Sequence, residues 1–139
     1  MKKILCILLL AVMLLLPSCA PRLGDKASLT DWFHKNEDAF MEAAESGDFT
    51  ALEKLRGVES VSQSEGCVDI LCGGNGFGPG THYYGLYYAE EDIWAEFAAD
   101  PASAWTVEGN GYRFREKDGD NVFYVEPLGG GYYYYEQHF

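Results

Sequence analysis

Cys72 and His82 are the two residues whose types and spacing best suit covalent chemistry. The glycine-rich segment 73–80 separates two strand-like runs, so it is predicted to be the loop of a β-hairpin. If Gly73 and Thr81 flank that loop as partners, Cys72 lies opposite His82, with Cβ atoms about 4.5–5.5 Å apart. A histidine beside a thiol favours the thiolate nucleophile. The alternative is that Cys72 is a small buried residue at a strand end, with His82 at the rim.

The surroundings of Cys72 add little support for catalysis. Asp69 lies on the same predicted strand but on its opposite face, so it is poorly placed to orient His82. The sequence also predicts no oxyanion hole. We therefore expect a protein that is not an enzyme, and keep a thiol-dependent enzyme or redox protein using Cys72 and His82 as the alternative. Cys67 stands five extended residues before Cys72, roughly 16 Å away, whereas a disulfide needs Cα atoms within about 7 Å. We predict no disulfide between them.

Histidines and acidic residues do not form a recognisable metal motif. His34, His82 and His138 fall on three elements that we expect to be distant, and no Cys-x-x-Cys or His-x-x-x-His spacing occurs. Residues 118–121 offer oxygen ligands for a weak calcium site, but they lack the spaced acids and terminal glutamate of an EF-hand loop. A tight turn is the preferred interpretation there. We expect no metal site and no cofactor.

The glycine-rich segment itself invites comparison with phosphate-binding loops. Such loops follow a strand, open a helix and, in nucleotidases, place Lys-Ser/Thr at the helix start. Residues 73–80 contain no lysine and lead into another strand-like run. We therefore predict a hairpin loop in which glycines supply unusual backbone angles, not a nucleotide site.

Tyrosines are concentrated on two predicted strands, residues 81–88 and 132–138. Alternation sends Tyr84, Leu86 and Tyr88 to one face, which Leu86 indicates is the core. The other face then carries the candidate binding residues Tyr83, Tyr87, Tyr133 and Tyr135. Exposed tyrosine rings bind sugars or peptides at little entropic cost, so we expect a cell-wall, carbohydrate or protein ligand there. The alternative is that tyrosine simply suits a half-covered sheet.

Periodicity along the chain predicts which elements position these residues. Ser28 or Thr30 is predicted to begin a helix that ends at Gly47, and a shorter helix is predicted over residues 49–56. Residues 93–99 fit a short helix about as well as a loop. The remaining runs are strand-like, with turn signals about ten residues apart. The predicted fold is α+β, with one or two N-terminal helices packed on an antiparallel, meander-like sheet of about five or six strands.

Residues 58–139 resemble small secreted proteins of unknown function from Gram-positive bacteria. The similarity rests on four segments: Cys72-Gly-Gly-x-Gly76, Tyr83-Tyr-Gly-Leu-Tyr-Tyr88, Trp105 and Tyr133-Tyr-Tyr-Glu136. The resemblance implies a common fold and a location at the cell surface. It implies no activity.

The first nineteen residues have the pattern of a secretory signal. Lys2 and Lys3 precede an apolar run of about thirteen residues, which is too short for a spanning helix of about twenty. Leu16-Pro-Ser-Cys19 resembles the lipobox of bacterial lipoproteins, although proline departs from the usual small residue at the second position. The resemblance implies that signal peptidase II cuts before Cys19 and that the Cys19 thiol carries diacylglycerol. We therefore expect a protein anchored by lipid on the extracytoplasmic side of the membrane.

Length and charge limit the mature protein to one acidic domain. The chain has 139 residues and a net charge of −12. Removal of residues 1–18 takes away two of the 10 basic side chains, which leaves 8 against 22 acidic ones, or −14. Such an excess repels phosphate backbones, so we expect no nucleic-acid partner. The predicted organisation is a signal peptide over 1–18, the lipidated cysteine and a tether over 19–27, and a single domain over 28–139.

Overall fold

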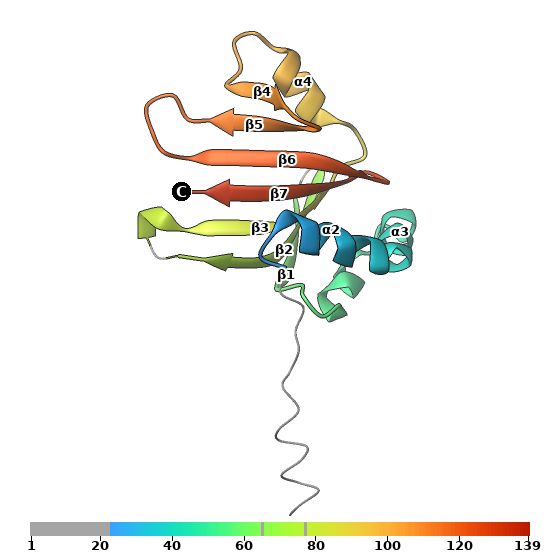
Figure 1. The fold of residues 1–139 in the computed structure, drawn as a ribbon. Coiled ribbons are helices and arrows are strands. Elements are labelled where there is room, and N and C mark those ends of the chain that lie inside the picture. The colour runs from blue at the N-terminus through green and yellow to red at the C-terminus, as the bar shows by residue number, and fades with distance from the viewer. Residues whose placement is uncertain (1–22, 65, 77) are drawn as a thin grey trace, which may run out of the picture.

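The computed structural model of the chain describes residues 23–64, 66–76 and 78–139. The predicted signal peptide and Cys19 lie outside these residues. The described part has the predicted α+β fold, with helices packed on an antiparallel sheet (Figure 1). Within it, no helix is both long and apolar enough to cross a membrane.

Three helical segments follow one another at the N-terminal end of the domain. They are α2 (Lys26–Lys35), α3 (Glu37–Ser46) and the 3-10 helix η1 (Phe49–Lys54). Asp25 begins α2, because its carboxylate accepts a hydrogen bond from the Ser28 backbone N–H at 2.9 Å; the predicted caps Ser28 and Thr30 are therefore wrong. The single predicted helix is divided at Asn36. Gly47 ends α3 in the left-handed conformation, as predicted.

The described residues form one seven-stranded sheet, so the expected five or six strands were close. Its order is β1-β2-β3-β7-β6-β5-β4, with every pair antiparallel. The last four strands form the predicted meander, and β7 then pairs with β3 at the centre. Residues 93–99 form a helix, α4 (Ile93–Ala99), between β3 and β4. The strands are β1 (Ser60–Ser64), β2 (Cys67–Asn75), β3 (His82–Tyr88), β4 (Trp105–Glu108), β5 (Gly111–Arg115), β6 (Val122–Gly129) and β7 (Tyr132–His138).

Two hydrophobic clusters lie on the two faces of this sheet. The larger joins α2, α3 and η1 to β2, β3 and β7, with Phe33, Phe40 and Tyr132 fully buried at its centre. The smaller lies on the opposite face, where Trp94 of α4 packs on Tyr133 in a cluster that also contains Tyr135. Figure 1 shows α4 at the β4 edge of the sheet, whereas α2 and α3 lie over its other half. Both faces of the sheet are therefore partly covered by hydrophobic packing. This packing limits how much of the tyrosine-bearing surface is accessible to solvent.

Candidate functional site

The structure separates Cys72 from His82, so the predicted thiol–imidazole pair is wrong. Asn75 is the register partner of His82, and Gly73 pairs with Tyr84 instead of Thr81. The cause is an irregularity between residues 71 and 73, where the ladder shifts and Cys72 has no partner on β3.

Burial makes the Cys72 thiol unsuited to nucleophilic attack. The residue is 6% exposed and belongs to the larger cluster, and its Sγ lies 3.6 Å from the Ile70 carbonyl oxygen. Burial, with smaller contributions from Asp69 and Glu59, raises the pKa of the Cys72 thiol to about 12. The thiol is therefore protonated at neutral pH and packed as a core side chain.

Cys67 is the second free thiol of the domain, at the other end of β2. Burial, helped by the Asp69 carboxylate, raises the pKa of Cys67 to about 11. Cys67 is half-buried and Cys72 is buried, as expected for two residues on opposite faces of the strand. Neither is in a disulfide.

The sequence assigned the tyrosines to the correct faces but overestimated their exposure. Tyr84, Leu86 and Tyr88 belong to the helix-covered cluster, as predicted. Of the candidate binding residues, Tyr133 and Tyr135 are buried, at 6% and 1% exposed. Trp94 and Phe123 cover much of this face. Tyr87 packs beside Trp94, with ring centroids 5.8 Å apart, and Phe123 lies against Tyr135 at 6.1 Å.

Tyr83 is the one predicted binding residue that stays exposed, at 37%. Gly85 leaves no gap between Tyr83 and Tyr87, because the Tyr135 ring lies over it. The Tyr135 hydroxyl donates a 2.8 Å hydrogen bond to Asp69, and Gln137 donates to the Tyr87 hydroxyl at 3.0 Å. These tyrosines therefore form a packed, hydrogen-bonded layer and not an open platform.

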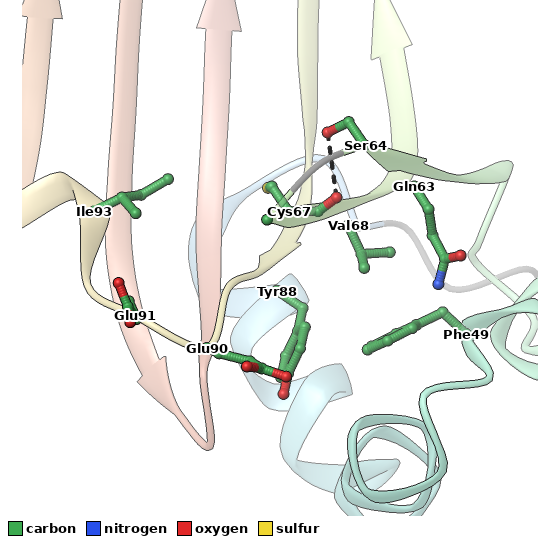
Figure 2. A pocket seen from close by; sticks show the side chains of 10 residues that line it. Phe49, Gln63, Ser64, Cys67, Val68, Tyr88, Glu90, Glu91 and Ile93 are labelled. Carbon is green, nitrogen blue, oxygen red and sulfur yellow. Dashed lines mark hydrogen bonds between the residues drawn. The ribbon is translucent and has the colours of Figure 1, made fainter.

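A pocket of about 380 Å³ lies at the end of the sheet where β3 leads into α4 (Figure 2). This volume is within the range of about 300–1,000 Å³ that small-molecule sites occupy. Figure 2 shows the Phe49 and Tyr88 rings pointing toward one another, and their centroids are 4.9 Å apart. The lining residues come from η1, the β1–β2 hairpin, β3, the following loop and the start of α4: Phe49, Gln63, Ser64, Gly66, Cys67, Val68, Tyr88, Glu90, Glu91 and Ile93.

The charge of this pocket is entirely negative among the residues that line it. Glu90 and Glu91 are exposed at its rim, and no Lys, Arg or His is among its described lining residues. The faces of aromatic rings attract cations, and carboxylates attract cations as well. The arrangement therefore suits a positively charged ligand with an apolar part.

Sequence reasoning missed this pocket, because its residues come from elements that are separate in the sequence. Phe49 lies nearly forty residues before Tyr88, and no local pattern joins them. One signal was available. Glu90 and Glu91 follow the tyrosine-rich strand after one intervening residue, so acidic side chains had to lie near the strand end where Tyr88 stands.

The sequence analysis expected the three histidines to lie on distant elements, and for two of them this is wrong. His82 on β3 and His138 on β7 are direct register partners, and their rings stack with centroids 4.0 Å apart. Burial lowers the pKa of His82, the neighbouring His138 lowers it further, and Glu136 acts in the opposite sense. His34 lies apart on α2, exposed, with Nδ1 3.6 Å from Glu37. Residues 118–121 lie in the connection between β5 and β6.

Comparison with known proteins identified no relative of this chain. No model of a known protein family matches the chain, and no curated protein or solved structure is significantly similar to it.

Proposed function

We propose that this chain is a lipid-anchored protein of the extracytoplasmic membrane surface, whose single domain binds a ligand without catalysing a reaction. The lipobox-like Leu16-Pro-Ser-Cys19 supports the anchor. The high negative charge supports it too, because an acidic domain is repelled by anionic headgroups and needs a covalent lipid to stay at a membrane.

The pocket beside Tyr88 is the proposed ligand site, in place of the packed tyrosine face. The observation that carries this proposal is the pairing of two aromatic rings, Phe49 and Tyr88, with the acidic rim of Glu90 and Glu91. Such a site recognises an ammonium group. The ammonium group belongs to a small molecule, or to the cell-wall or protein ligand that the sequence leads us to expect.

Phenyltrimethylammonium is expected to bind this pocket, and benzoate, with the same ring and the opposite charge, is expected not to. The Glu90→Gln/Glu91→Gln double variant should weaken phenyltrimethylammonium binding about two- to thirtyfold, because each exposed carboxylate contributes about 0.2–1 kcal/mol. Isothermal titration calorimetry at low salt measures both ligands. The matched control is Asp118→Asn/Asp120→Asn, which removes the same charge from a loop outside the pocket. Equal affinity for benzoate, or an equal loss in the control, would overturn the cation site.

The anchor is tested by the single substitution Cys19→Ser. The unaltered protein should sediment with membranes and enter the detergent phase, since two acyl chains suffice for stable attachment. The Cys19→Ser protein should keep its signal peptide, because the proposed cleavage and lipidation both require that thiol. Membrane fractionation measures attachment, and intact-mass measurement reports cleavage of the signal peptide and the presence of the lipid. A Cys19→Ser protein that is still cleaved and carries the lipid mass would show that Cys19 is not the anchor.

A further inference from the structure

His82, Glu136 and His138 converge at the end of the sheet remote from the pocket. Each offers one ligand atom, and these atoms all lie within 4.8 Å of one another. Glu136 and His138 are two residues apart on β7, so their side chains leave the same face. His82 reaches that face from β3, where it is directly opposed to His138. Three side chains of the types that bind divalent transition metals thus meet at one place.

The backbone around these residues holds them in place before any ligand arrives. β7 is paired on both sides, so His138 has register partners in His82 on β3 and Val122 on β6. Beyond the strand end, the Phe139 N–H donates to the Thr81 carbonyl at 3.0 Å. Figure 1 shows the C-terminus beside the start of β3, at the end of the sheet away from α3. A cross-strand pair fixed in this way loses little freedom on binding.

His82 carries an unsatisfied polar atom at this point. Its Nε2 is buried, and no hydrogen-bond partner for it exists among the described residues. A buried polar atom without a partner is unfavourable, because it has given up its hydrogen bond to water. A metal ion held with His138 and Glu136 would satisfy this nitrogen. The orphaned atom and the ligand cluster are separate observations that point to the same occupant.

Glu136 is oriented by neighbours that leave it free to bind a cation. The Tyr134 hydroxyl donates to Glu136 Oε2 at 3.0 Å, and Arg113 Nη2 lies 3.9 Å from Oε1. The Arg113 guanidinium is engaged more closely elsewhere, with its Nε 2.7 Å from Glu108. A carboxylate ligand supported by an outer hydrogen bond is the usual arrangement at protein metal sites.

We propose that His82, Glu136 and His138 form a binding site for Zn²⁺, with water completing the tetrahedron. Ligand atoms on one tetrahedral zinc lie about 3.3 Å apart, whereas the three ligand atoms here lie within 4.8 Å of one another, so binding requires the side chains to rotate and the stacked imidazole rings to turn toward a common ion. Two imidazoles favour zinc over Ca²⁺ or Mg²⁺, which prefer oxygen ligands. The net charge of −12 draws divalent cations toward the domain. This site is independent of the proposed ammonium pocket.

Zinc titration of the purified, chelator-treated full chain tests the proposal. We expect one Zn²⁺ per chain by calorimetry, and about tenfold or greater weakening in His138→Ala and in Glu136→Gln. His138 is exposed, so its replacement should leave the fold intact, and circular dichroism checks this. Glu136→Gln keeps an acceptor for Tyr134. With Co²⁺ as the probe, visible absorption should appear in the unaltered protein and disappear in both variants.

Two control variants separate this site from other zinc ligands in the domain. His34→Ala removes an exposed histidine that also lies near a carboxylate, and Cys67→Ser removes the more accessible free thiol. Both should bind zinc within about twofold of the unaltered protein if binding depends on the proposed ligands, since distant sites act independently. Unchanged zinc affinity in His138→Ala and Glu136→Gln would overturn the proposal. So would loss of binding in either control.

Discussion

Gly85→Ala is expected to lower the free energy of unfolding by about 3 kcal/mol or more, because the centre of β3 has no room for a methyl group. A Cβ placed on Gly85 would stand 2.9 Å from the Tyr135 ring and closer still to the Ile70 carbonyl oxygen. The oxygen belongs to the neighbouring strand, so rotating a side chain cannot relieve the clash. Tyr135 is also fixed, since it is 1% exposed and bonded to Asp69.

Urea unfolding followed by the fluorescence of the three tryptophans measures this change. Gly80→Ala is the matched control, because a Cβ at Gly80 would have no atom within 4 Å. We expect Gly80→Ala to stay within about 1 kcal/mol of the unaltered protein. If Gly85→Ala unfolded at the same urea concentration as Gly80→Ala, Tyr135 could not be packed over β3.

Strand positions were predictable from the sequence, but the partners across β2 and β3 were not. Turn residues separate each strand from the next, which is why β7 has the predicted bounds. The predicted register between β2 and β3 rested on regular alternation on both sides of the glycine-rich loop. The irregularity at Cys72 moves the ladder, and Gly73, which marks its position, was assigned to the loop instead. The Cys72–His82 hypothesis depended on that register and failed with it.

The two faces of β3 were also predictable, but which of them is covered was not. Alternation correctly separated Tyr84 and Leu86 from Tyr83 and Tyr87. Coverage of the second face depends on Trp94, and residues 93–99 fitted a helix and a loop about equally well. The same limit applies to the histidines, because the pairing of β7 with β3 joins segments about fifty residues apart. Only the Glu136-x-His138 spacing was visible locally.

Trp94→Ala is expected to lower the free energy of unfolding by about 3–5 kcal/mol, the usual cost of removing a buried tryptophan. Trp94 is 8% exposed, and its ring lies within 6.4 Å of five other aromatic rings, measured between centroids. Trp94→Phe should cost far less. The indole Nε1 is buried without a hydrogen-bond partner among the described residues, so phenylalanine removes an unsatisfied donor as well as some packing.

Urea unfolding followed by far-UV circular dichroism measures both variants, because Trp94 is itself a fluorophore. Phe97→Ala is the control on the same helix, since Phe97 is 45% exposed and should change stability by about 1 kcal/mol or less. A large loss in Trp94→Ala with a small one in Phe97→Ala means that α4 closes the second face over Tyr87 and Tyr133. If Trp94→Ala were instead as stable as Phe97→Ala, α4 would not be a fixed cover. The tyrosine face would then be open to a ligand, and the pocket beside Tyr88 would lose its priority as the binding site.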